Sequence, residues 1–348
     1  MLEQVDPLNM IDISQIDSAL GHSLGVNRIS FGELVSRAIT GQLDLSFGSI
    51  LRGILNFIFM EVTAHISLMQ QLIFVAVLAS LLKVLTDTFQ AKAAGELGFY
   101  VSYITLVAII FSSFRIGVTI SIDMITNVTN FIRISIPVII TLVLMSGNAT
   151  GAYVYNSLFI FAINIINTVI INIVMPVIIF LVTIQVVNYL TENEILKNMS
   201  DFISKYVNMG TKALAGVFIS VLALQRISAP IINNAAIRGA RLTINAVPVV
   251  GGALSSAVDS ALYLAQGAKS GVIVAVVIAI IYICIVPITK LFAMMFVYKF
   301  VAAIIQPICD KRIVKCMNTI GNYTGLLLGV SVMVMVMFSI ALIMLVSF

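Results

Sequence analysis

The stretch Ser228–Asp259, SAPIINNAAIRGARLTINAVPVVGGALSSAVD, guides the interpretation of the whole chain. If residues 229–245 are helical, four polar side chains at i, i+4, i+7 and i+11 share one narrow stripe: Asn234, Arg238, Arg241 and Asn245. Pro248 then removes a backbone donor, and Gly251 and Gly252 loosen the backbone, so a regular helix cannot continue. Asp259 belongs to a second polar stripe beyond this break. The pattern predicts a re-entrant hairpin or a broken helix over about residues 213–268.

Composition places this polar stretch in a membrane protein. The 348 residues are 60% hydrophobic and only 10% charged, with a mean hydropathy of +1.12. A soluble protein of this length would carry about 25% charged residues. Long apolar runs indicate helices, because a membrane barrel shows short alternating segments. We therefore predict an all-α, polytopic integral membrane helical bundle. The net charge of +4 comes without a basic block, so no nucleic-acid binding is expected.

The chain divides into two regions by composition. Residues 1–62 mix apolar and polar residues at helical spacing and predict an amphipathic region at the membrane interface, with packing on the bundle as the alternative. Residues 63–348 form the predicted transmembrane domain. Its expected spans are Ile66–Leu85, Leu97–Arg115, two or three helices within 134–190, Ser270–Thr289, Leu291–Ile308 and Asn318–Phe348. Between the second and third of these, Arg115–Arg133 is expected to be a surface helix or a helix extension.

Several polar and small residues within the apolar runs indicate contacts between helices. Asn164, Asn167 and Thr168 lie deep in an uncharged segment, where polar side chains usually join one helix to another. GxxxG spacing recurs at Gly321, Gly325 and Gly329 and predicts the close approach of another helix. The positive-inside rule groups four sets of basic residues on the cytoplasmic side: Lys83/Lys92, Lys197/Lys205/Lys212, Lys269 and Lys311/Arg312/Lys315.

Charged residues within membrane segments are the candidates for function, because each costs about 2.5 to 3.5 kcal/mol on insertion scales. One hypothesis is a water-accessible conduit lined by Asn234, Arg238, Arg241, Asn245, Asp259 and Lys299. The alternative is a helix lying flat on the membrane, with arginines reaching lipid phosphates. No phosphate-binding loop, HExxH or GxSxG motif is present, so neither an enzyme nor a cofactor is expected. Two histidines and three dispersed cysteines predict no metal site.

Several long motifs resemble the stage III sporulation protein AE family of endospore-forming bacteria. They include VPVVGG at Val247–Gly252 with the following SSAVDS, and YKFVAAIIQPICDKRIVKCMNTIG at Tyr298–Gly321. GVFISVLALQ at Gly216–Gln225 and RGAR at Arg238–Arg241 also match. The resemblance covers nearly the whole chain. It departs from the family at Asn233, where an acidic residue is usual, and at Gln266–Lys269, where a Lys-Asn pair is usual.

The resemblance implies a membrane subunit of the channel or secretion-like complex that joins the mother cell to the engulfed forespore. Its implied location is the mother-cell-derived outer forespore membrane. The implied partners are the other stage III A proteins, including a cytosolic ATPase and ring-forming proteins, and the forespore protein SpoIIQ. We expect a homo-oligomer that forms or supports a conduit for ions or small molecules. A secondary transporter and a non-conducting assembly scaffold remain the alternatives.

Overall fold

The computed structural model describes residue 35 and residues 47–89, 92–145, 149–189, 196–245 and 251–346, although side chains within 224–245 and 251–269 lie outside this description. Within these ranges nearly every residue is helical and none forms a strand. Five helices are long and apolar enough to cross a membrane. The predicted all-α, multi-pass fold is therefore confirmed.

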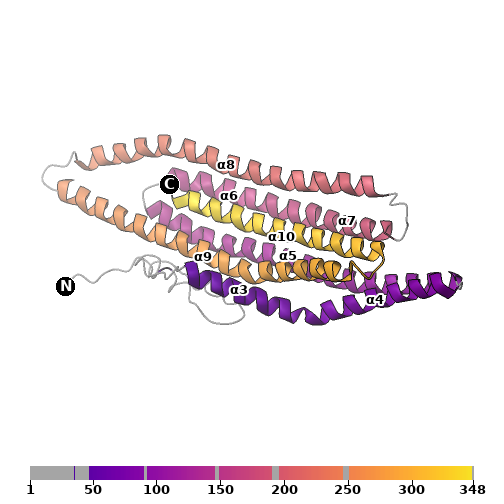
Figure 1. Ribbon diagram of the computed structural model, residues 1–348. Helices are drawn as coiled ribbons and strands as arrows, with labels where there is room; N and C mark the ends of the chain where they lie inside the picture. The colour runs from indigo at the N-terminus through magenta and orange to yellow at the C-terminus, as the bar shows by residue number, and fades with distance from the viewer. Residues whose placement is uncertain are drawn as a thin grey trace.

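The described helices form one elongated bundle (Figure 1). In chain order they are α3 (Phe47–Ala64), α4 (Ile66–Phe89), α5 (Lys92–Met145), α6 (Ala149–Val169), η2 (Ile170–Val174), α7 (Met175–Asn188), α8 (Lys197–Asn245), α9 (Gly251–Ile305) and α10 (Lys311–Val346). η2 is a short π-helical turn that joins α6 to α7 directly before Pro176. Proline lacks a backbone donor and clashes with the preceding turn, so one wider turn accommodates it within an otherwise continuous rod.

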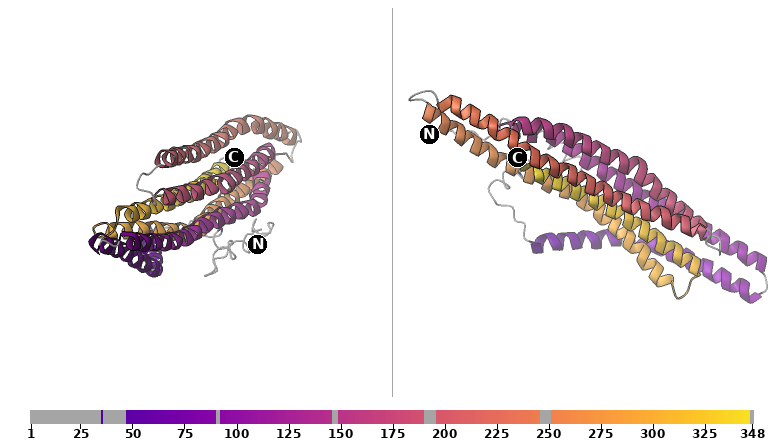
Figure 2. Two further views of the ribbon diagram at one scale, coloured as in Figure 1. Left: turned by 90° about the vertical axis from the view of Figure 1, so that its right-hand side faces the viewer. Right: turned by 90° about the horizontal axis from the view of Figure 1, so that it is seen from above.

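The long helices from α4 onward run back and forth along the bundle. The junctions of α4 with α5, α7 with α8 and α9 with α10 lie at one end, and the C-terminus lies at the other (Figures 1 and 2). Lys83, Arg312 and Lys315, from two of the basic groups expected on one side of the membrane, therefore share one end of the bundle. Their side of the membrane stays a prediction.

The membrane-crossing helices are longer than the sequence predicted. The candidate spans are Ile66–Val84, Leu97–Met145, Phe159–Asn188, Ser270–Ile305 and Lys311–Met344. Leu97–Met145 has 49 residues. At 1.5 Å per residue it measures about 74 Å, against about 30 Å for the hydrocarbon core of a bilayer. The bundle therefore extends beyond the hydrocarbon layer or tilts strongly across it.

One predicted helix boundary is wrong, because the expected spans Ser270–Thr289 and Leu291–Ile308 are one helix, α9, which passes through Pro287 without a break. Of the two alternatives for Arg115–Arg133, the structure has the helix extension, since α5 continues through this segment and through Pro137. The segment 134–190 holds the end of α5 and one nearly continuous rod. A proline removes only one backbone hydrogen bond, and packing on both sides of that residue keeps the helix intact.

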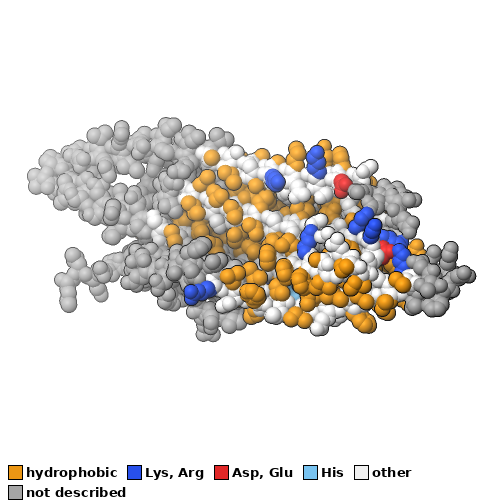
Figure 3. Space-filling model, in the orientation of Figure 1, with side chains coloured by type: hydrophobic (Ala, Val, Ile, Leu, Met, Phe, Trp, Pro, Cys, Tyr) orange, Lys and Arg blue, Asp and Glu red, His pale blue; other side chains and the backbone are white. Residues whose placement is uncertain are grey.

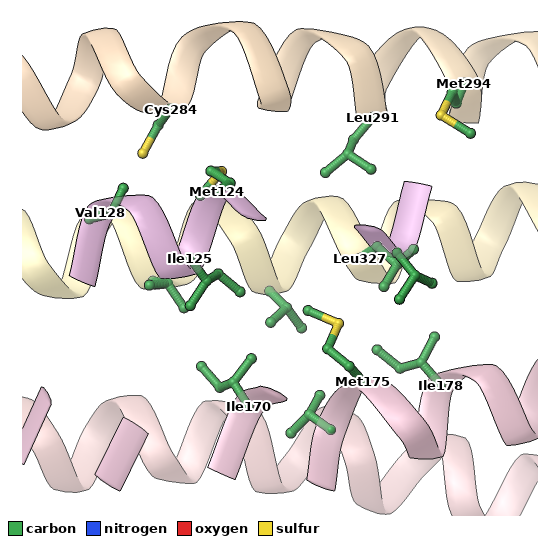
Figure 4. Packing of buried hydrophobic residues seen from close by; sticks show 14 of the residues in the cluster. Met124, Ile125, Val128, Ile170, Met175, Ile178, Cys284, Leu291, Met294 and Leu327 are labelled. Atoms are coloured by element: carbon green, nitrogen blue, oxygen red, sulfur yellow. The ribbon is translucent and has the colours of Figure 1, made fainter. Parts of the chain in front are cut away.

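The core lies where α5, α9 and α10 pack together. Figure 4 shows Met124, Ile125 and Val128 on α5, with Cys284, Leu291 and Met294 on α9 and Leu327 on α10. All seven side chains are almost fully buried. Gly117 lets α5 approach α9, because a Cβ atom there would lie 3.4 Å from Met294 and 3.6 Å from Leu291.

The predicted N-terminal region lies mostly outside the described residues. Its last part is α3, which packs along α9 and leaves Leu55, Phe57, Phe59 and Met60 exposed. Packing on the bundle was the alternative to an interfacial helix. A helix that packs on one side and exposes large apolar side chains on another is compatible with both, so the interfacial location stays a prediction.

Candidate functional site

The predicted polar stripe lies on helical backbone. α8 runs without interruption through residues 229–245, and α9 begins at Gly251, so Gly251 and Gly252 form its first turn. Pro248 lies outside the described residues, as do the side chains of the stripe: Asn234, Arg238, Arg241, Asn245 and Asp259. Whether the stripe lines a conduit stays a prediction.

Lys299 is the one member of the predicted set whose side chain is described. It is half-buried on α9 and reaches across to α10. Its ammonium group donates to the Oδ1 atom of Asn318 at 3.0 Å and also to Oδ1 of Asn322. Both partners are neutral, so the charge of Lys299 is solvated by amides and is not cancelled by a carboxylate among them.

The three glycines of the GxxxG run lie in different surroundings. A Cβ atom on Gly321 would lie 3.1 Å from Cγ of Lys299, and one on Gly325 would lie 3.0 Å from Sδ of Met295. Gly329 is exposed and has nothing within 4 Å of such an atom. Each four-residue step drifts by about 40° around a helix, so Gly329 is turned about 80° from Gly321. Two of the three glycines therefore face α9, and close packing of another helix at Gly329 stays a prediction.

A polar cavity of about 370 Å³ opens between α7, α8 and α10. It is lined by Gln185, Tyr189, Asp201, Ser204, Asn208, Lys315, Thr319, Asn322, Tyr323 and Leu326. Three of its ten lining residues are hydrophobic, counting tyrosine, in a chain that is 60% hydrophobic by the same count: Tyr189, Tyr323 and Leu326. Lys299 is not one of the lining side chains, but it donates a hydrogen bond to one of them, Asn322. On the face seen in Figure 3, most Lys and Arg side chains lie in the half nearest the α9–α10 turn.

Buried hydrogen bonds fix the wall of this cavity. Gln185 donates to the Ser200 hydroxyl at 2.6 Å, and that hydroxyl lies 3.3 Å from the Tyr323 hydroxyl. On the same wall the hydroxyls of Tyr189 and Thr319 lie 2.8 Å apart. These bonds link α7 to α8 and α10. A polar wall whose members bond to each other keeps its geometry without a ligand.

The first half of α8 carries a polar strip at the edge of the bundle. Ser200 and Thr211 are buried, Asp201, Ser204 and Asn208 line the cavity, and Lys205 and Lys212 are exposed beside it. The neighbouring face exposes large apolar side chains: Met199, Phe202, Tyr206, Met209 and Val217. The apolar face suits lipid, and the polar strip indicates a hydrated surface next to it.

A second polar surface lies on the exposed face of α5. Seven of its exposed residues between 112 and 133 are polar: Ser112, Arg115, Thr119, Asp123, Asn127, Asn130 and Arg133. The predicted surface helix Arg115–Arg133 is therefore a polar stretch of α5. Arg133 donates to Asn164, and Thr129 donates to Asn167 at 3.4 Å. These two asparagines join α6 to α5, which is the role that the sequence indicated.

An ionic cluster fastens the end of the bundle. Asp310 caps the N-terminus of α10, where its Oδ1 atom accepts the backbone N–H of Arg312 at 2.8 Å. The same carboxylate pairs with Lys83 and with Nε of Arg312, and the Arg312 guanidinium lies 4.4 Å from the centre of the Phe99 ring. Burial opposes ionisation of Asp310, but hydrogen bonds from Lys83 and Arg312 outweigh it and lower its pKa. This cluster ties α4 and α5 to the α9–α10 turn.

The sequence identified Lys299 but missed the cavity. A signal for it exists, because Ser200, Ser204, Asn208 and Thr211 follow the i, i+4, i+8, i+11 spacing of a single helical stripe. On α10 a similar stripe exists, because Lys315, Thr319 and Asn322 follow i, i+4, i+7 spacing. In the described ranges, no three His, Cys, Asp or Glu side chains gather as metal ligands.

Comparisons with known proteins agree on one family. The sequence profile of the family described as stage III sporulation protein AE matches residues 29–348. A protein of Bacillus subtilis (strain 168) named stage III sporulation protein AE is 25% identical over 305 residues, which cover 87% of this chain and 76% of that protein. No solved structure matches the chain.

Proposed function

The chain belongs to the stage III sporulation protein AE family, and on that premise we propose that it is a membrane subunit of the mother cell–forespore channel or secretion-like complex. Membership of the family implies a role in sporulation. The proposal goes further and assigns the subunit a conduit for ions or small molecules. It acts without chemistry of its own, so no enzymatic step or cofactor is part of the proposal.

The polar strip of α8 that lines the cavity is the observation that carries the conduit. A hydrated path through a membrane needs polar groups along the path and apolar groups facing lipid. Asn208 and Met209 are adjacent in sequence and both exposed, but Asn208 lines the cavity, whereas Met209, 62% exposed, belongs to the neighbouring apolar face. A scaffold that only held partners together would have no need of a polar cavity inside its own bundle.

The proposed location is the mother-cell-derived outer forespore membrane. The proposed partners are the other stage III A proteins, including a cytosolic ATPase that supplies energy and ring-forming proteins, together with the forespore protein SpoIIQ. A homo-oligomer is part of the proposal, because the exposed polar face of α5 is costly in contact with lipid and favours cover by another subunit.

Flux measurements on the purified chain in liposomes test the conduit. We expect wild-type protein to pass small ions, Asn208→Leu to reduce the flux at least fivefold, and the neighbouring Met209→Leu to leave it unchanged. Both substitutions introduce the same side chain one residue apart, so general effects on insertion are shared. Correctly inserted wild-type protein that passes nothing would support the scaffold alternative. Saturable uptake of one solute, coupled to an ion gradient, would support the secondary transporter.

A further inference from the structure

We infer that the cavity between α7, α8 and α10 binds a small oxyanion, a carboxylate or a phosphate, on the donor surface that Lys299 organises on α10. The inference names the class of solute and rests on the proposed function only for the passage of that solute. Four side chains make up this surface, and we call them the donor wall: Lys299, Lys315, Asn318 and Asn322. Lys315 and Asn322 line the cavity, and Lys299 and Asn318 lie outside its lining and are joined to it through the contact of Lys299 with Asn322.

The charge of Lys299 is not cancelled within the protein. No carboxylate of the described residues lies within 4.0 Å of its ammonium group, whereas Asp310 has two cationic partners by the same measure. Amide oxygens solvate an ammonium group, but they leave its full positive charge in place. Both hydrogen bonds of the ammonium group lie at an exposed position, so this charge is open to a solvated anion.

The lysine also sets the direction of the two asparagine amides. Its ammonium group occupies the Oδ1 atoms of Asn318 and Asn322, so the Nδ2 amino groups are the donors that remain. Asn318 and Asn322 are one helical turn apart, and Lys315 precedes them on the same face of α10. The outcome is a row of N–H donors beside the cavity. Surfaces of this kind bind carboxylate and phosphate oxygens.

The glycine beneath the lysine is part of this arrangement. Three carbon atoms of the Lys299 stem would lie 3.1 to 3.2 Å from a Cβ on Gly321. A side chain at this position would lift the stem off α10 and move the ammonium group away from the two amides. The predicted packing glycine therefore lets a lysine from α9 lie flat on α10 and reach them.

The opposite wall of the cavity carries one negative charge. Asp201 on α8 is the one carboxylate among the lining side chains. It repels an anion, so its removal is expected to tighten binding. The space itself is adequate: 370 Å³ corresponds to about a dozen waters at about 30 Å³ each, which leaves room for a hydrated phosphate or a short carboxylate.

Binding is measured on the full chain in detergent free of phospholipid, by calorimetric titration with inorganic phosphate and with acetate. We expect saturable binding of at least one of them by the wild type. Asn322→Asp should weaken it at least tenfold, because the new carboxylate keeps the contact with Lys299 and cancels its charge. The control Asn198→Asp makes the same charge change at an exposed position of α8 that does not line the cavity, and should bind like the wild type. Asp201→Asn should bind at least threefold more tightly.

Two further comparisons are needed. One distinguishes a lipid headgroup from a soluble anion as the ligand, and the other distinguishes a failure of anion binding from a failure of the conduit. If a short-chain phosphatidylglycerol binds with the same dependence on Asn322→Asp and the soluble anions do not, the phosphate of a lipid headgroup is the ligand and the donor wall stands. If neither kind of anion binds, or if Asn322→Asp binds as tightly as the wild type, the inference is overturned. Flux in liposomes is read separately: binding without flux would refute the conduit alone, and cation-selective flux without anion binding would refute the donor wall alone.

Discussion

Substituting Gly321 by alanine tests the contact between α9 and α10 on which the donor wall depends. The new methyl group would lie 3.1 Å from Cγ and 3.2 Å from Cδ and Cε of Lys299, whereas unstrained carbon atoms lie about 3.5 to 4.0 Å apart. The lysine has little freedom to move, because its backbone belongs to α9 and its ammonium group is bound to two asparagines on α10. Overpacking of this kind costs about 1 to 3 kcal/mol.

Gly329→Ala is the matched control. It lies in the same helix with open space around it, so it should gain the ordinary advantage of alanine over glycine, about 0.5 to 1 kcal/mol. Gly321→Ala gains the same advantage but also suffers the overpacking, so we expect it to be about 1 to 3 kcal/mol less stable than Gly329→Ala.

The assay is equilibrium unfolding in mixed micelles, followed by circular dichroism, for both glycine variants in the wild-type and Lys299→Ala backgrounds. Shortening Lys299 removes the three crowded atoms, so in that background the two alanine variants should be equally stabilising. The cycle isolates the pairwise interaction between residues 299 and 321. Equal effects of the two substitutions in the wild-type background would refute the packing argument, and with it the reason for a glycine at 321.

Three other perturbations follow from the described contacts. Asp310→Asn keeps a capping side chain but loses the charge; because the Lys83 side chain is 40% exposed, we expect a loss of about 1 to 3 kcal/mol, with about 0.5 to 2 kcal/mol more for Asp310→Ala. Because the pKa of Asp310 is lowered, its stabilisation is fully present above about pH 4 and is lost as pH falls through the lowered value; urea titrations over this range should show less acid dependence in Asp310→Asn. The buried hydroxyls of Ser113 and Tyr298 bond to each other, so Ser113→Ala or Tyr298→Phe alone should cost about 1 to 3 kcal/mol and the pair together less than the sum, measured by unfolding. In a cysteine-free background, a membrane-impermeant thiol reagent should label Asn208→Cys faster than Met209→Cys in liposomes, and equal labelling would contradict a hydrated cavity.

The fold class could be predicted because it follows from composition, whereas helix lengths could not. Sixty per cent hydrophobic residues and long uncharged runs leave helices as the way to satisfy backbone groups in lipid. The ends of helices depend on competing contacts. Pro137 and Pro287 each weaken a helix locally, yet both lie inside helices that continue past them. Tertiary packing decides that competition, and a single sequence does not reveal it.

In the candidate site too, some residues can be recognised from their local sequence, whereas others are brought together only by the fold. Lys299 could be identified because a charge within an apolar run is conspicuous in the sequence. Its partners, Asn318 and Asn322, are ordinary polar residues near a basic turn, and nothing local identifies them as partners of a lysine on α9. The cavity is harder still to predict, since Gln185 and Tyr323 reach a common hydroxyl, Ser200, from helices more than 100 positions apart. Only the antiparallel course of the bundle brings them together.

The exposed side of α5 has a consequence for assembly. Arg133 and Asn164 share a hydrogen bond, so α5 and α6 are at the same level of the bundle there. At that level α6 exposes Phe161 and Ile165, which suit lipid. From Ser112 to Arg133, however, the face of α5 exposes two arginines and an aspartate, each of which costs about 2.5 to 3.5 kcal/mol at the centre of a bilayer.

Lipid on every side of the chain would suit the apolar face of α6 but would leave the polar face of α5 without water or polar contacts. Near its start, α5 itself exposes Leu97, Val101 and Ile104, so its change to polar residues further along is a property of the surface and not of the helix as a whole. A bundle with one polar side needs water or another protein there, while its apolar sides remain in lipid. This sidedness favours a subunit of a larger assembly over a self-contained monomer. Under the proposed function the two surfaces have separate roles, with α5 facing a neighbouring subunit and the cavity beside α8 forming the path.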